Sequence, residues 1–146
     1  MKYGKIIVEE NERALLQNII GMDQSYRDQI YQASLEKLKR EFVLADILND
    51  NEMPEDVVRF NSVVTIETPW NVKRSYQIVV PEKSDIRNNK ISVLAPMSLS
   101  LFGYAEGDAI EWQFPTGTDS IKIVKVVQRR SRLDFSKYET GISEVF

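Results

Sequence analysis

Met53-Pro54-Glu55-Asp56-Val57-Val58 and Ala95-Pro96-Met97-Ser98-Leu99-Ser100-Leu101-Phe102-Gly103 punctuate a run of predicted strands between Glu52 and Gly117, and this run decides the fold class. In the second stretch, Pro96 suits the first turn of a short helix and Gly103 suits its end, which predicts a helix from about residue 97 to 102. Several strands around one short helix are typical of an α+β domain. We therefore predict an α+β fold whose C-terminal part is an antiparallel sheet with one short helix.

Alternation of apolar and polar residues places the strands, because successive side chains of a strand point to opposite faces of the sheet. The apolar residues that define the predicted strands are Val58, Phe60, Val64 and Ile66; Tyr76, Ile78 and Val80; Ile91 to Leu94; Ile110, Trp112 and Phe114; and Ile121 to Val127. The last strand is partly apolar on both faces, which indicates a β-bulge or a position beneath other segments. Trp112 is predicted to lie in the core, and Trp70 to fold over its own hairpin turn.

Upstream of this run, residues 10 to 48 are predicted to form two helices joined at Gly21. The short β-branched segment Lys5–Val8 precedes them and is predicted to be extended and to lie against another segment. Apolar residues at helical spacing give the first helix, Glu10 to Ile20, one apolar face. Gly21 follows directly and is predicted to cap this helix in the left-handed conformation.

The second predicted helix runs from Ser25, as its N-cap, to Leu48, with Asp28 as an acidic residue in its first turn. Its apolar seam has the spacing of helices that pack side by side and consists of Tyr31, Leu35, Leu38, Phe42 and Ala45. The predicted lengths are ~36 Å for this helix and ~16 Å for the first. Two arrangements fit: a short antiparallel helical hairpin that projects from the sheet, or a helical cap folded onto it.

The segment Asn49–Pro54 is rich in helix-breaking residues and marks a predicted domain boundary. We expect an N-terminal segment and helical hairpin over residues 1–51, followed by a C-terminal domain with its tail over residues 52–146. A chain of 146 residues has room for one substantial core and an appendage.

Composition excludes several classes of function. The chain has no Cys and no His, which excludes disulfides, thiolate zinc sites and the common nucleophile and base pairs of enzymes. Its net charge of −3 argues against direct binding of nucleic acid, since such binding depends on clustered Lys and Arg. No apolar run reaches the length of a membrane span or a signal peptide, so we expect a cytoplasmic protein with a protein partner and no cofactor.

Three stretches carry a resemblance to a known family: Glu52–Val58 with Asn61-Ser62, Ile91–Pro96, and Leu101–Gly103 through Gly107-Asp108 to Trp112 and Pro115. Together they resemble the C-terminal domain of the Gre-type transcription elongation factor family, and within it the regulator of nucleoside diphosphate kinase (Rnk) subgroup, whose helical hairpin is short. The resemblance implies an FKBP-like fold without prolyl isomerase activity. The chain departs from the family pattern at Ser98, Leu99 and Ser100, where smaller residues are usual.

The resemblance also implies a partner and a place to bind it. Gre-type factors bind bacterial RNA polymerase at the rim of its secondary channel, with the hairpin pointing inward. By analogy, Leu94, Ala95 and Pro96, at the start of the short helix, are the candidate polymerase-docking residues. The alternative is structural, with Leu94 in the core and Pro96 as the first residue of the helix.

Two acids at the predicted hairpin tip, Asp23 and Asp28, are the candidates for chemistry, because Gre factors stimulate transcript cleavage through tip carboxylates that help hold a magnesium ion. Each acid also has a local role, Asp23 in a turn and Asp28 at a helix N-terminus, and we favour these roles. A hairpin paired over only ~16 Å is too short to reach the polymerase's catalytic site. We therefore predict no catalytic and no metal-binding residues.

These observations leave three functional hypotheses. The leading one is a non-enzymatic transcription regulator that binds RNA polymerase at the secondary channel and competes with other channel-binding factors. The second is a Gre-like factor that stimulates transcript cleavage through Asp23 and Asp28. The third is a generic protein-interaction module that uses the helical face around Tyr26 and Ile30.

Overall fold

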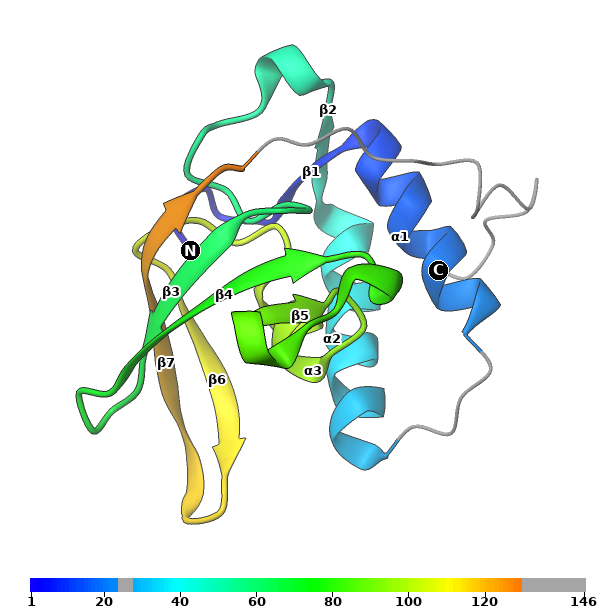
Figure 1. Ribbon diagram of the computed structural model, residues 1–146. Helices are drawn as coiled ribbons and strands as arrows, with labels where there is room; N and C mark the ends of the chain where they lie inside the picture. Colours follow the sequence, from blue (N-terminus) through cyan, green and yellow to red (C-terminus); the bar gives the residue numbers. More distant parts are fainter. Residues whose placement is uncertain (24–27, 130–146) are drawn as a thin grey trace.

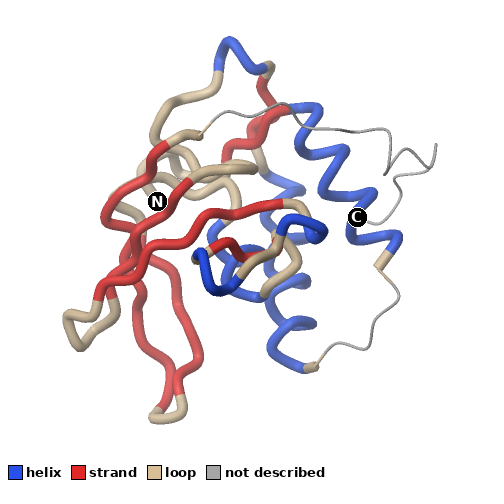
Figure 2. The backbone as a smooth tube through the Cα atoms, viewed as in Figure 1, coloured by secondary structure: helices blue, strands red, loops and turns tan. Residues whose placement is uncertain are grey.

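The computed structural model describes residues 1–23 and 28–129, and within them the chain has the predicted α+β fold (Figure 1). Three α-helices lie on one side of a curled five-stranded sheet (Figures 1 and 2). The helices are α1 (Glu10–Met22), α2 (Gln29–Leu44) and α3 (Pro96–Leu101). The strands are β1 (Ile7–Glu9), β2 (Asp46–Leu48), β3 (Val63–Glu67), β4 (Lys73–Val79), β5 (Lys90–Ser92), β6 (Ala109–Phe114) and β7 (Gly117–Val127).

The main sheet has the strand order β5-β4-β3-β7-β6. All neighbouring pairs are antiparallel except β4 and β5, which are parallel. The prediction of an antiparallel sheet is therefore wrong for this one pair. The reason lies in the connection: it contains two short 3-10 turns, Pro81–Lys83 and Ile86–Asn88, and brings the chain back beside Gln77. There β5 begins and runs in the same direction as β4.

Two features of the strands depart from simple alternation. The predicted bulge is present in β7: Thr65 pairs with Lys125 and Ile66 with Ile123, which leaves Val124 as the extra residue. The first predicted strand, by contrast, begins only at Val63. Residues before it form a turn, in which Asn61 adopts a positive φ of 69° that a strand does not accommodate.

The N-terminal segment is extended and paired at Ile7–Glu9, which confirms the prediction for Ile7 and Val8, while Lys5 lies in a bend. Strand β1 pairs with β2 in parallel, with Ile7 opposite Asp46 and Glu9 opposite Leu48. Residues 46–48 were predicted to end the second helix, which is wrong. The helix stops at Leu44 because the following backbone turns to hydrogen-bond with the N-terminal segment, where the Asp46 N–H donates to the Ile6 carbonyl at 3.1 Å.

The helix ends differ from the prediction in two respects. Gly21 lies inside α1, and the C-cap is Asp23 with φ −75° and ψ 119°, so no left-handed glycine ends this helix. Asp28 is the N-cap of α2 rather than a first-turn residue, and its carboxylate accepts a hydrogen bond from the Tyr31 N–H at 2.9 Å. Ser25, the predicted N-cap, lies outside the described residues.

Helices and sheet contribute to the same core. Helix α2 packs along α3 (Figure 1), and one apolar cluster contains Leu16 and Ile19 of α1, Leu38 of α2 and residues of the sheet such as Ile78 and Ile123. Of the two predicted arrangements, the structure therefore has the helical cap folded onto the sheet. With 13 and 16 residues, the two helices are about 20 and 24 Å long, so the predicted ~36 Å for the second is too long.

The short helix α3 matches its prediction closely, with Pro96 in its first turn. Gly103 follows with φ +84°, and a Cβ at this position would lie 2.8 Å from the Ile6 Cβ. The close approach of the N-terminal segment to α3 therefore requires glycine. Leu99, where smaller residues are usual in the family that the sequence resembles, is 1% exposed and fills a position in the core.

In the part of the chain that the structure describes, no helix is both long enough and apolar enough to span a bilayer. The same residues contain no group of three or more acidic side chains arranged to hold a metal ion.

Candidate functional site

The predicted docking residues divide between core and surface. Leu94 is 4% exposed and belongs to the core cluster, so its side chain follows the structural alternative. Ala95 is the N-cap of α3 and Pro96 its first residue. Both are partly exposed and line a surface hollow together with Met97. Of the three candidates, Ala95 and Pro96 are therefore the ones that a partner can touch.

That hollow is one of two that adjoin each other. It has a volume of about 350 Å³, and its lining includes Ala95, Pro96 and Met97 together with Ile30 of α2 and Trp112 of β6. A second hollow of about 390 Å³ lies between α2, α3 and β6 and also includes Ile30 and Trp112 among its lining residues. We call the two together the α2–β6 groove. Its other lining residues are Asp28, Gln29, Ala33, Ser34, Lys37, Tyr76, Ile91, Ser100, Glu111, Gln113 and Thr118.

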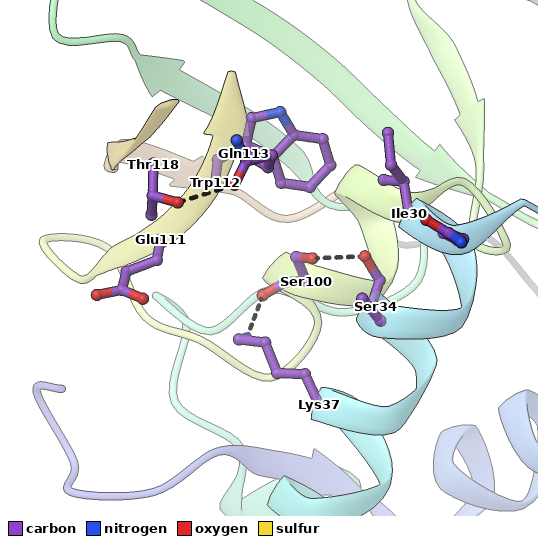
Figure 3. Close-up of a pocket in the computed structure, with 10 residues that line it drawn as sticks. Ile30, Ser34, Lys37, Ser100, Glu111, Trp112, Gln113 and Thr118 are labelled. Atoms are coloured by element: carbon purple, nitrogen blue, oxygen red, sulfur yellow. Dashed lines mark hydrogen bonds between the residues drawn. The ribbon is translucent and has the colours of Figure 1, made fainter. Parts of the chain in front are cut away.

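Ile30 and Trp112 form the facing walls of the groove (Figure 3). Ile30 lies one position off the buried seam of α2, next to Tyr31, and its side chain is 49% exposed. Trp112 is partly buried and packs against the core. The prediction that Trp112 is a core residue thus holds for part of the indole, while the rest faces the hollow.

A polar cluster at the inner end of the groove fixes α2 to α3. The Lys37 ammonium donates to the Glu41 carboxylate at 3.1 Å, to the Tyr104 hydroxyl at 3.0 Å and to the Ser100 carbonyl at 3.2 Å. The Tyr104 hydroxyl in turn donates to Glu41. Nearby, the Ser100 hydroxyl donates to Ser34 at 3.3 Å. All three hydrogen atoms of the ammonium are used, so Lys37 has none left for a ligand.

Burial changes the protonation equilibria of this cluster. It lowers the pKa of Lys37, because the charged form loses water, although the Glu41 carboxylate acts in the opposite direction. Burial also raises the pKa of the Tyr104 phenol well above its ordinary range, and the hydrogen bond to Glu41 adds to this effect. Around neutral pH, Tyr104 is therefore protonated and serves as a hydrogen-bond donor.

A second buried cluster attaches α1 to the C-terminal domain. The Glu12 carboxylate accepts hydrogen bonds from the Arg59 guanidinium, with Nε at 2.9 Å, and from the Phe60 N–H at 3.1 Å. Arg59 also pairs with Asp50 at 2.8 Å. Burial raises the pKa of Glu12, whereas the hydrogen bonds from Arg59 and Phe60 lower it in part. Glu12 and Arg59 are only 5% and 8% exposed, so this pair is structural.

The two candidate tip acids lie at neighbouring helix ends, Asp23 at the end of α1 and Asp28 at the start of α2. Asp23 is the C-cap residue of α1, and its N–H donates to the Ile20 carbonyl at 3.3 Å. Asp28 caps α2 through its carboxylate. Asp28 thus lies at a helix N-terminus as the sequence favoured, whereas Asp23 ends α1 in an extended conformation and not in a turn. The described residues contain no group of three or more acids that could hold a metal ion.

The sequence identified some of these features and missed others. It singled out Ile30 as a surface residue, but it gave no sign that Ile30 faces Trp112, since the two lie far apart in the chain. Trp70 does not fold over its own turn alone: its ring contacts Phe114 of β6 edge to face, with centroids 4.8 Å apart.

Comparison with known proteins identifies the family of the chain. Residues 53–128 match the family model described as transcription elongation factor, GreA/GreB, C-terminal. The transcription elongation factor GreA of Hyphomonas neptunium is 30% identical over 96 residues, which cover 65% of this chain and 61% of that protein. GreA of Brucella anthropi is 33% identical over 81 residues, which cover 55% and 52%. The alignments thus span less than two thirds of these relatives.

A solved structure, the transcription elongation factor GreA/GreB from Nitrosomonas europaea, covers more of the chain. It superposes with a TM-score of 0.66 and 28% sequence identity, over 84% of this chain and 98% of that one. The similarity therefore extends beyond the segment that the family model matches.

Proposed function

The chain belongs to the GreA/GreB family of transcription elongation factors, and from this membership we propose that it binds bacterial RNA polymerase at the secondary channel. It acts there as a non-enzymatic transcription regulator that competes with other channel-binding factors. Within the family we place it in the regulator of nucleoside diphosphate kinase (Rnk) subgroup, with an FKBP-like C-terminal domain over residues 52–146 and a short helical hairpin within residues 1–51. It works with the polymerase in the cytoplasm and needs no cofactor of its own.

The observation that carries the proposal is the match of residues 53–128 to the C-terminal domain of these factors. That segment contains the whole main sheet and α3, together with Ala95 and Pro96 at a partly exposed position beside a groove. The polymerase contact is therefore proposed for the surface around Ala95 and Pro96, with Leu94 holding the loop to the core beneath.

The absence of cleavage activity is proposed from the helices. Helices of about 20 and 24 Å, one of them packed along α3, leave little length to extend into a channel. The Asp28 carboxylate accepts the Tyr31 N–H through its Oδ1 atom, so this oxygen already caps α2. Both observations favour occupation of the channel entrance over participation in hydrolysis.

Direct binding and competition test this proposal. The fluorescently labelled full-length chain, titrated with purified bacterial RNA polymerase, is expected to bind saturably, and an unlabelled Gre factor is expected to displace it. A variant at the outer face of the sheet, such as Lys125→Ser, serves as a matched control and keeps its affinity. If the folded chain does not bind the polymerase, or binds it without being displaced by the Gre factor, the proposal is wrong.

A further inference from the structure

The α2–β6 groove has the form of a binding site for part of another protein. Its two hollows, of about 350 and 390 Å³, meet between Ile30 of α2 and Trp112 of β6. Ile30 is half exposed, although an apolar side chain gains stability when it leaves water. An exposed aliphatic side chain opposite an indole offers an apolar slot in which a third apolar side chain fits between the two.

The charges around the slot are acidic. Among the residues that the structure describes, Lys37 is the one cation that lines it, and Lys37 already donates to Glu41, Tyr104 and Ser100. Two acids remain, Asp28 and the exposed Glu111, and neither carboxylate forms an ion pair among the residues that the structure describes. The positive end of α2 offsets the charge of Asp28, but Glu111 has no such compensation. A ligand that complements the groove is therefore apolar at its centre and basic at its edge.

The position of the groove connects it to the proposed polymerase contact. Ala95 and Pro96, the accessible docking residues, form one wall of the smaller hollow. A partner that contacts this loop therefore reaches the slot between Ile30 and Trp112 without leaving the same surface.

We propose that the α2–β6 groove binds a segment of RNA polymerase that inserts an apolar side chain between Ile30 and Trp112 and places a Lys or Arg beside Glu111. This inference rests on the proposed function and adds to it, because it makes α2 a part of the docking surface. The helical region then contributes to affinity through the side of α2.

Substitution of Ile30 tests the apolar slot, and Val43 supplies a control on the same helix. Val43 is 81% exposed and lies outside the groove, so Ile30→Asp and Val43→Asp introduce the same charge into α2 at different faces. We expect Ile30→Asp to weaken binding of the full-length chain to purified polymerase by roughly tenfold or more, with Val43→Asp unchanged. Equal effects of the two variants, or no effect of Ile30→Asp, would overturn the proposal.

A pair of charge variants tests the acidic edge. Glu111→Lys is expected to weaken binding by about threefold or more, mainly through slower association. Gln113→Glu, which retains an acceptor for the Thr118 hydroxyl, is expected to strengthen it. Tighter binding of Glu111→Lys would contradict the proposed basic partner. Circular dichroism of each variant establishes that it is folded, and Val43→Asp provides the reference for both series.

The experiment also separates this inference from the proposed function and from other occupants. If the wild-type chain does not bind polymerase, both proposals are wrong. If the wild-type chain and Ile30→Asp bind polymerase equally well, only the groove proposal is wrong. Self-association that Ile30→Asp abolishes would identify a second copy as the occupant and overturn the proposal. The chain's own C-terminal residues would be the occupant of the groove if a variant truncated after Arg129 binds polymerase more tightly than the full-length chain and Ile30→Asp removes this gain. That result would also overturn the proposal.

Discussion

Removal of the Glu12 carboxylate is expected to destabilise the protein more than any change at an exposed acid. In Glu12→Ala, the buried Phe60 N–H loses its acceptor and the buried Arg59 guanidinium keeps only Asp50, whose side chain is 59% exposed. Breaking a buried ion pair on one side costs about 3–5 kcal/mol. Because Asp50 still compensates part of the charge, we expect the lower end of this range, about 3 kcal/mol.

Urea denaturation followed by circular dichroism measures this loss as a change in the free energy of unfolding. About 3 kcal/mol corresponds to a decrease in Tm of roughly 6–12 °C for a chain of this size. Glu10→Ala is the control, since Glu10 is exposed in the same first turn of α1 and contributes only about 0.3–1 kcal/mol through the helix dipole. The double variant Glu12→Ala/Arg59→Met removes both charges and should recover much of the loss.

Two results would refute this reasoning. If Glu12→Ala costs no more than Glu10→Ala, the buried pair does not attach α1 to the C-terminal domain as described. If the double variant is as unstable as the sum of its single substitutions, the loss comes from packing rather than from an unpaired guanidinium.

Three further predictions concern the backbone, the polar cluster and the metal. Gly103→Ala should lower the free energy of unfolding by more than about 2 kcal/mol, because it adds the clash with Ile6 to the strain of a positive φ. Gly107→Ala, which has nothing within 4 Å of the added Cβ, carries the strain alone and should cost about 1–2 kcal/mol. Equal losses of stability in urea denaturation would exclude the close approach at Gly103. The folded-state pKa of Tyr104 lies above the unfolded value, so its contribution to stability is fully present below about pH 10 and is lost as the pH rises further; Tyr104→Phe should flatten this alkaline loss, and an unchanged pH profile of stability would contradict the assignment. Isothermal titration of the chain with Mg²⁺ should give no saturable heat, and millimolar or tighter binding that Asp23→Asn abolishes would contradict a purely structural role for this acid.

The sequence predicted the parts of this fold that depend on local patterns. The predicted short helix, about residues 97 to 102, agrees with α3 within one residue at each end, and alternation located β4 and β6. Local patterns also misled: Val58 and Phe60 alternate with polar residues as a strand would, but the positive φ of Asn61 turns the chain before β3. Likewise, Gly21 has the spacing of a helix cap, although α1 continues past it.

The parts that the sequence did not predict depend on contacts between distant residues. Residues 46–48 leave the helical pattern because they pair with β1, and nothing near them in the chain indicates that partner. The same holds for the contact of Trp70 with Phe114 and for the groove between Ile30 and Trp112. For the candidate site, the sequence supplied Ala95, Pro96 and Ile30 separately, and only the fold brings them to one surface.

The most direct test of the account adds the protein to stalled elongation complexes with radiolabelled transcripts, alone and together with a Gre factor. We expect the transcripts to keep their length when this protein is added alone. When both proteins are present, we expect cleavage by the Gre factor to slow as the concentration of this protein rises. Transcripts that shorten with the protein alone, and no longer shorten with Asp23→Asn, would contradict the central claim that it occupies the channel without taking part in hydrolysis.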